Sequence, residues 1–109
     1  MAKITKVYDG DTFTFYVDLG FEVWVKSRIR LFGVNTPEVR GEHKIFGKQV
    51  RDYVRELILG KMVSIRVYKK GKYGRYVASV YFNADWQIEP VDLSKHLVEK
   101  GYAVEVDYG

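Results

Sequence analysis

Two aspartates lie on either side of a glycine near the N-terminus, in the segment Asp9-Gly10-Asp11-Thr12. Carboxylates two residues apart can share one face of the chain, and their oxygens are hard ligands of the kind that Ca²⁺ and Mg²⁺ prefer. A tight turn favours the same residue types and is the simpler explanation of this tetrapeptide taken alone. The segment therefore indicates either a turn or a cation site.

Three other polar features have non-catalytic explanations when each is taken alone. Thr36-Pro37-Glu38 has the residue types of a helix start, with threonine as N-cap and proline at the first helical position. Arg30 follows the pattern of a solvent-facing strand arginine. Lys72-Tyr73-Gly74-Arg75 can be a charged hairpin tip that keeps a strand edge soluble.

Together the four features supply what phosphodiester hydrolysis requires. The scissile phosphate is anionic, so attack by water needs charge neutralisation and an activated nucleophile. Arginines can bind the phosphate oxygens, carboxylates can bind a cation, and a glutamate can act as the base. The sequence contains no phosphate-binding glycine loop, no nucleophilic serine elbow and no cysteine, and its two histidines, His43 and His96, lack metal-site spacing.

The first third of the chain is predicted to form a β-meander. Phe13, Phe15 and Val17 alternate with polar residues, as in a half-buried strand. Two further β-rich runs follow at 21–26 and 28–34. The opening therefore predicts a meander of three strands.

The rest of the chain predicts two helices and a basic hairpin. Apolar residues at helical spacing predict a helix that ends before Gly60, and strands at 62–68 and 75–82 enclose the turn-like segment 69–74. Asp92 can cap a second helix that ends at Gly101, with a short strand or tail at 102–106. His96 would lie on this helix, as a packing or surface residue.

These elements predict an α+β fold that is mainly β: a five-stranded barrel of the OB type with two helices. A closed barrel removes exposed sheet edges, which suits short strands. A split β-sheet with two packed helices would fit the same pattern, because strand count alone does not establish closure.

Length and composition are typical of one globular domain spanning 1–109. The net charge is +4, but residues 40–75 carry eleven basic and three acidic side chains, a local excess of eight positive charges. The N-terminus has no apolar segment of the signal-peptide type, and no apolar run approaches the roughly 20 residues that span a bilayer. We therefore expect a monomer that is cytoplasmic by default, or secreted if a signal peptide has been removed.

Four segments resemble the staphylococcal-nuclease-like (thermonuclease) family in order and approximate spacing. They are Asp9-Gly10-Asp11-Thr12, the run from Arg30 to Glu38, Lys72-Tyr73-Gly74-Arg75, and the run from Leu97 to Ala103. The resemblance covers nearly the whole chain. It implies an OB barrel with helices and a calcium-dependent nuclease that acts on DNA and RNA.

The resemblance also implies a role for each matching residue. Asp11 matches the main carboxylate ligand of the cation, Thr36 a ligand through its backbone carbonyl, and Asp9 lies nearby as support. Glu38 matches the general base, and Arg30 and Arg75 match the arginines that stabilise the pentavalent transition state. Tyr73 matches a tyrosine that contacts the nucleotide phosphate, and Lys72 and Tyr108 are further candidate substrate contacts.

Two positions depart from the family pattern. Asn35 stands where an aspartate usually serves as the second carboxylate ligand, and its neutral oxygen predicts weaker cation binding or a changed preference, with Mg²⁺ or Mn²⁺ as alternatives to Ca²⁺. Tyr108 is out of register with the two tyrosines that pack around the nucleotide in the family, so nucleotide stacking is expected to differ.

The leading hypothesis is a metal-dependent nuclease acting on DNA, RNA or both. The main alternative is a non-catalytic OB module that binds single-stranded nucleic acid through a basic groove and aromatic stacking. A third reading is a protein-interaction domain, which would show no salt-dependent binding to nucleic acid.

Overall fold

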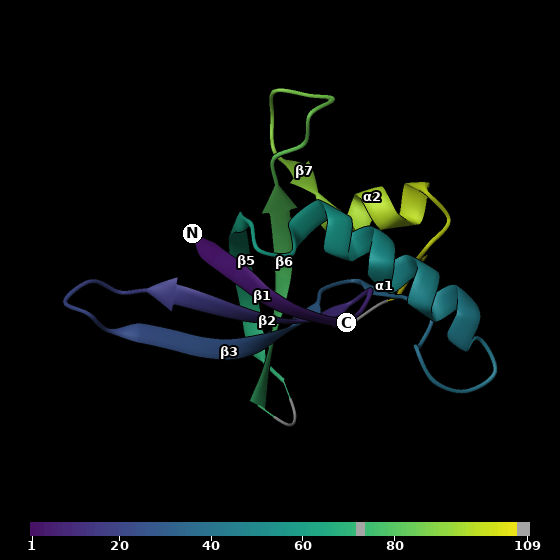
Figure 1. Cartoon of the computed structure of the whole chain (residues 1–109), viewed down its shortest axis with the longest axis horizontal. Helices are drawn as coiled ribbons and strands as arrows, with labels where there is room; N and C mark the ends of the chain where they lie inside the picture. Colours follow the sequence, from purple (N-terminus) through teal and green to yellow (C-terminus); the bar gives the residue numbers. More distant parts are fainter. Residues whose placement is uncertain (72–73, 107–109) are drawn as a thin grey trace.

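The computed structural model describes residues 1–71 and 74–106 of the chain. It is built mainly from strands, with one helix in the middle of the sequence and one near its end (Figure 1). The elements in chain order are β1 (Ala2–Asp9), β2 (Thr12–Asp18), β3 (Trp24–Leu31), β4 (Val34–Asn35), α1 (Lys44–Ile58), β5 (Met62–Lys70), β6 (Arg75–Phe82), β7 (Val91–Asp92), α2 (Leu93–Glu99) and β8 (Val104–Glu105).

Five of these strands close into a barrel. Their order is β3-β2-β1-β5-β6, and β3 pairs in parallel with β6, so the first and last strands of the row meet. The inward residues of the strands and the apolar faces of both helices form one buried cluster. The expected five-stranded OB-type barrel with two helices is therefore confirmed.

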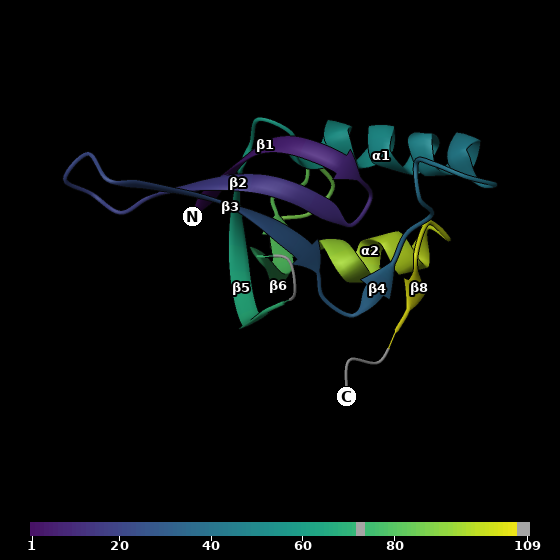
Figure 2. The ribbon, with the colours of Figure 1, turned by 90° about the horizontal axis from the view of Figure 1, so that it is seen from below.

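The β2–β3 hairpin is the most extended part of the molecule. Its strands pair without a register shift from Thr12 opposite Arg30 to Asp18 opposite Trp24. In two perpendicular views the outer half of the hairpin projects away from the helices (Figures 1 and 2). One end of this hairpin thus belongs to the barrel, while the other lies beyond it.

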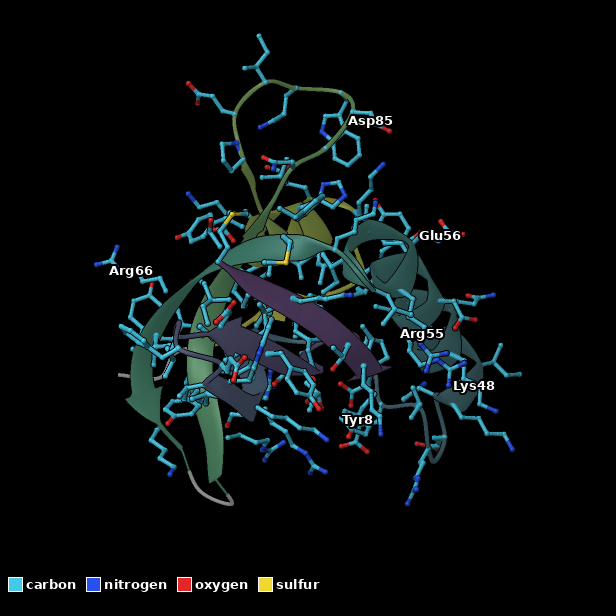
Figure 3. The ribbon with its side chains drawn as sticks, turned by 60° about the vertical axis from the view of Figure 1, so that its left-hand side comes forward. Tyr8, Lys48, Arg55, Glu56, Arg66 and Asp85 are labelled. Atoms are coloured by element: carbon cyan, nitrogen blue, oxygen red, sulfur yellow. The ribbon has the colours of Figure 1, made fainter. Side chains whose placement is uncertain are left out.

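Helix α1 packs on the β1 side of the barrel with an apolar stripe of Val50, Val54 and Ile58. Arg55 ties the helix to the sheet because its Nη2 donates to the carbonyl of Val7 at 3.0 Å. Figure 3 shows Arg55 on the side of the helix that faces β1. The helix therefore has a fixed position relative to the β1–β2 turn.

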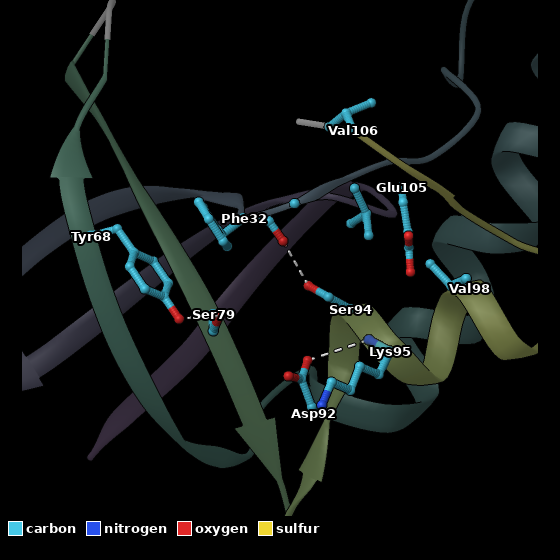
Figure 4. Close-up of a pocket in the computed structure, with 11 residues that line it drawn as sticks. Phe32, Tyr68, Ser79, Asp92, Ser94, Lys95, Val98, Glu105 and Val106 are labelled. Carbon is cyan, nitrogen blue, oxygen red and sulfur yellow. Dashed lines mark hydrogen bonds between the residues drawn. The ribbon is translucent and has the colours of Figure 1, made fainter. Parts of the chain in front are cut away.

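Helix α2 begins as predicted, since the Asp92 side chain accepts a hydrogen bond from the amide of Lys95 at 3.3 Å. Ser94 Oγ donates to the carbonyl of Phe32 at 3.0 Å and so joins the helix to the end of β3 (Figure 4). Gly101 takes a positive φ of 78° where the chain leaves the helix. The helix ends here because this residue takes the left-handed conformation, which glycine adopts without strain.

The strand predictions for the first third of the chain were wrong in two respects. The predicted runs 21–26 and 28–34 form the single strand β3, which ends at Leu31 before Gly33 turns the chain with a φ of 81°. β1 was not predicted at all. Register shifts on either side of the pairs at Lys6 and Val7 interrupt its alternation of apolar and polar residues, because a bulge changes which face each residue occupies.

Thr36-Pro37-Glu38 does not start a helix. α1 begins at Lys44, and its N-cap residue His43 makes no side-chain capping bond. The amide of Thr36 instead donates to Asp11 Oδ2 at 3.0 Å, which holds the segment against the β1–β2 turn. Long-range bonding to a carboxylate has replaced local capping at this position.

Neither described helix is long and apolar enough to cross a membrane.

Candidate active site

A polar cavity of about 390 Å³ lies at one rim of the barrel. The β1–β2 turn, the end of β3, the segment after β4 and the start of β6 all contribute to it. The residues that line it are Asp9, Asp11, Thr12, Arg30, Asn35, Thr36, Glu38 and Arg75. Four segments that are distant in sequence therefore meet at one point.

This cavity brings together every candidate residue that falls within the described part of the chain. The three proposed catalytic side chains and the three proposed cation ligands all line it, and Asp9 lies beside them. Lys72, Tyr73 and Tyr108, the candidate substrate contacts, lie outside the described residues. The roles assigned to all of these residues remain predictions.

The two aspartates of the β1–β2 turn form a close carboxyl pair. The Asp11 amide donates to Asp9 Oδ1 at 3.2 Å, and Asp11 is buried, with 7% of its surface exposed. Burial, together with the hydrogen bond and negative charge of Asp11, raises the pKa of Asp9 to about 7. A positive charge placed here would favour the ionised form of Asp9.

Asp11 and Arg30 form the fixed half of the cavity. Arg30 Nη1 lies 3.1 Å from Asp11 Oδ2 and donates to the carbonyl of Val34 at 2.9 Å and that of Leu31 at 3.2 Å. Arg30 Nη2 donates to Asn35 Oδ1. The Arg30 guanidinium is thus held by four acceptors before any ligand arrives.

Glu38 and Arg75 form the open half. Glu38 is exposed and Arg75 is partly exposed, and neither side chain forms a hydrogen bond or an ion pair with the described residues. Glu38 also borders a second hollow, lined by Tyr8, Val39 and Arg40 among others. These two charges are free to interact with a ligand.

Two glycines allow the cavity to form. A Cβ at Gly47 of α1 would lie 2.0 Å from the carbonyl oxygen of Glu38, and a Cβ at Gly10 would lie 2.8 Å from Thr36 Oγ1. The helix and the turn can approach the 36–38 segment only because these side chains are absent. Sequence reasoning missed both roles, although a glycine inside an otherwise helical pattern is a recognised signal of close approach.

The donors in the cavity fit a hard divalent cation that also keeps water or phosphate ligands. Carboxylates, an amide oxygen and a backbone carbonyl are the ligand types that Ca²⁺ and Mg²⁺ prefer. The raised pKa of Asp9 reflects a pair of acids that a cation would stabilise, and Thr36 Oγ1 is buried without a hydrogen-bond partner. Asp9, Asp11 and Glu38 line the cavity, but the described residues contain no group of three or more acidic, histidine or cysteine side chains placed to hold a metal.

Two other cavities lack the combination of acidic residues and arginines. The one in Figure 4, of about 280 Å³, lies between α2, the end of β3 and β8, and hydrogen bonds within the fold join several of its polar groups. Another, of about 380 Å³, is mainly apolar and lies between the 35–37 segment, the start of α1 and residues 101–104. Neither places an acid and an arginine opposite each other.

The fold and the rim site define an OB barrel with carboxylates and arginines arranged around one cavity. A family model described as "Staphylococcal nuclease homologue" matches residues 28–108. The chain belongs to this family.

Several characterised and uncharacterised proteins are similar to the chain. An uncharacterized protein of Methanocaldococcus jannaschii, MJ1439, is 30% identical over 94% of this chain and 57% of its own length. The probable endonuclease LCL3 of Coccidioides posadasii is 29% identical over 94% of this chain and 39% of its own length. The staphylococcal-like nuclease CAN1 of Arabidopsis thaliana is 35% identical over 66% of this chain and 21% of its own length.

The chain thus spans between about a fifth and somewhat over half of the length of these relatives.

Proposed function

We propose that the chain is a metal-dependent nuclease that hydrolyses phosphodiester bonds of DNA, RNA or both. The observation that carries the proposal is the meeting of a carboxyl pair, two arginines and an exposed glutamate in one cavity. Relatives named as nucleases or probable endonucleases support the same activity.

The described side chains can divide the reaction between them. Arg30 and Arg75 would donate hydrogen bonds to oxygens of the scissile phosphate and stabilise the charge of the pentavalent transition state. Glu38 would accept a proton from the attacking water, because its carboxylate is exposed at the same cavity and unpaired. Arg30 is pre-positioned by its four acceptors, whereas Arg75 would be positioned by the substrate.

The cation would be held by Asp11, Asn35 and the backbone carbonyl of Thr36, with Asp9 as support. We propose Ca²⁺, with Mg²⁺ or Mn²⁺ as alternatives, because all these ligands are oxygens. When bound, a divalent cation supplies charge neutralisation at the phosphate. Asn35 contributes no charge, so we expect weak binding that the phosphate of the substrate strengthens.

A labelled single-stranded DNA incubated with Ca²⁺, Mg²⁺ or Mn²⁺ tests the proposal against an EDTA control. We expect cleavage only with a cation, and a rate about 10²- to 10⁴-fold lower for Glu38→Gln, which removes the proposed base while keeping the side-chain shape. Glu42→Gln is the matched control, since Glu42 is exposed in the same loop and does not line the cavity. Intact DNA with every cation, together with intact RNA of the same sequence, would contradict the proposal.

A second candidate function is a non-catalytic barrel that binds single strands. Asn35 at a usual carboxylate position favours it, and the described residues contain no group of three acidic or histidine side chains placed to hold a metal. It predicts salt-dependent DNA binding that is the same with and without a cation, and no cleavage.

A further inference from the structure

The outer face of the β1–β2–β3 sheet carries a row of basic side chains that begins at the cavity. Along β3, Ile29 and Leu31 point into the core and are fully buried, so Lys26, Arg28 and Arg30 lie on the opposite face. Side chains on one face of a strand repeat about every 6.8 Å. The row therefore presents evenly spaced cations that lead away from Arg30.

Aromatic rings lie beside these cations. Lys26 is opposite Tyr16 in the β2–β3 register, and its Nζ lies 5.7 Å from the ring centroid. The guanidinium of Arg28 lies 5.1 Å from the ring centroid of Tyr8. Trp24 continues the same face, with 58% of its surface exposed. We call these five residues, Tyr8, Tyr16, Trp24, Lys26 and Arg28, the hairpin ladder.

The hairpin ladder is continuous with the candidate active site. Arg30 pairs with Thr12 across β2 and β3, and both residues line the cavity. Arg28 lies next along the face and is the register partner of Arg75 in β6. From Arg30 to Trp24 the ladder extends about 20 Å, a length suited to several nucleotides.

Charge on this face is mainly positive. Lys3 and Lys6 of β1 lie opposite Tyr16 and Thr14 and add two cations beside the ladder. Asp18 and Glu22 are acidic residues at the outer end, and Asp18 Oδ1 accepts a hydrogen bond from the amide of Gly20 at 2.8 Å. A polyanion is therefore the charge-complementary ligand.

The rings are placed to interact with a ligand rather than with the core. Tyr8 is 39% exposed, and a hydrogen bond from Thr14 and the charge of Arg28 lower the pKa of its hydroxyl. Figure 3 shows Tyr8 at the cavity end of β1, whereas Arg66 of β5 points away from the barrel on the far side. An exposed ring beside a cation offers a surface on which an unpaired base can stack while the cation binds its phosphate.

We propose that the hairpin ladder binds the stretch of single-stranded nucleic acid adjacent to the scissile phosphate, with phosphates on Lys26 and Arg28 and bases stacked on Trp24 and Tyr16. The proposal rests on the proposed nuclease function for its continuity with the cavity. A single strand is the ligand because bases within a duplex are stacked on each other and do not expose their faces to these rings.

Fluorescence anisotropy of a labelled oligothymidylate in EDTA tests the binding without cleavage. Trp24→Ala and Arg28→Gln are each expected to weaken binding about tenfold. Arg28→Gln is also expected to reduce the slope of log affinity against log salt by about 0.7, the value for one phosphate contact to a single strand. Both side chains are exposed, and thermal melting of each variant verifies that it folds.

Two matched controls come from the rest of the chain. Trp86 is as exposed as Trp24, at 57%, but lies in the loop between β6 and β7. Arg66 lies over the ring of Tyr68 at 5.4 Å, as Arg28 lies over Tyr8, but on β5. Trp86→Ala and Arg66→Gln are expected to bind the oligothymidylate as the wild type does.

Cleavage assays separate this proposal from the proposed function. Hairpin ladder variants are expected to raise the KM for long single strands more than the KM for a dinucleotide. Absence of cleavage by the wild type would refute the nuclease while the binding assay still tests the ladder. The ladder is refuted if its variants bind like the wild type, if the controls weaken binding equally, or if duplex DNA competes as well as single strands.

Discussion

The two arginines of the cavity differ in how the fold treats them. Arg30 is held by Asp11, Asn35 and two backbone carbonyls, whereas Arg75 makes no hydrogen bond or ion pair with the described residues. One guanidinium is part of the scaffold, and the other is available to a ligand. Two residues with the same proposed role can therefore contribute differently to stability and to activity.

Arg75→Ala is expected to have the largest effect on activity alone. It should lower kcat/KM about 10²- to 10³-fold, the loss typical of one donor to a developing charge, and leave the free energy of unfolding unchanged. Cleavage kinetics and urea denaturation measure both quantities, with Arg66→Ala as the control. If Arg75→Ala lost as much stability as Arg30→Ala does, the proposed difference between the two arginines would be wrong.

Arg30→Ala is expected to reduce both activity and stability. Removal of its side chain leaves the buried carboxylate of Asp11 without its cation, at a cost of about 1–3 kcal/mol in unfolding free energy. Urea denaturation of Arg30→Ala beside Arg75→Ala measures the difference. Equal unfolding free energies would show that the observed network contributes nothing to the fold.

Gly47→Ala is expected to disturb the open half through the backbone. The added methyl would meet the Glu38 carbonyl at 2.0 Å, so α1 or the 36–38 segment must move. We expect a loss of about 1–3 kcal/mol in stability and a lower kcat in the folded fraction. Gly60→Ala, whose Cβ meets nothing within 4 Å but whose φ is 75°, is a control for backbone strain without this contact.

Asn35→Asp is expected to strengthen cation binding about tenfold, because affinity rises with the charge of the ligands. Isothermal calorimetry with Ca²⁺ measures the effect. Asn83→Asp adds the same charge at an exposed loop position away from the cavity and controls for net charge. Unchanged affinity in Asn35→Asp would show that residue 35 is not a ligand of the cation. Its side-chain oxygen would then be engaged by Arg30 Nη2, as it is in this structure.

The smallest expected effect is on the pH dependence of stability and comes from His96, which does not line the cavity. Burial first, and the charge of Lys100 second, lower the pKa of His96, while Glu99 opposes the shift; its Nε2 lies 2.6 Å from the Tyr53 hydroxyl. The folded state therefore favours neutral imidazole. This contribution to stability is complete above the ordinary pKa of about 6.5 and is lost as pH falls through the lowered folded value.

Urea denaturation across this pH range should show that His96→Gln loses less stability on acidification than the wild type does. His43→Gln, an exposed position at the start of α1, is the control. Parallel pH profiles for wild type and His96→Gln would contradict the prediction.

The barrel could be predicted from the sequence, and the candidate site residues could be selected, because their residue types are locally distinctive; the roles of these residues stay predictions. The alternation around Phe13 predicted β2, and the combination of Asp11, Arg30, Glu38 and Arg75 predicted a shared site that the cavity brings together. β1 was missed because bulges interrupt its alternation. Local patterns are therefore sufficient to select candidate site residues, but they do not reveal a strand whose pairing is interrupted by bulges.

The division between fixed and open arginines could not be predicted, because it depends on contacts between segments distant in sequence. The amide of Thr36 donates to the Asp11 side chain, 25 positions away in the sequence. The packing of α1 brings Gly47 against the carbonyl of Glu38. The exposure of Trp24 and Trp86 could not be predicted for the same reason, since no local pattern shows which segments extend beyond a barrel. These features arise only when the barrel closes.

Hydrolysis of single-stranded DNA and RNA in water enriched in heavy oxygen tests whether the cavity is a glutamate-assisted phosphodiesterase site. With a divalent cation, we expect one heavy oxygen in each new terminal phosphate, formed at a rate that falls in Glu38→Gln. Intact DNA and RNA, unlabelled product, or labelled product formed equally fast by Glu38→Gln would contradict this assignment.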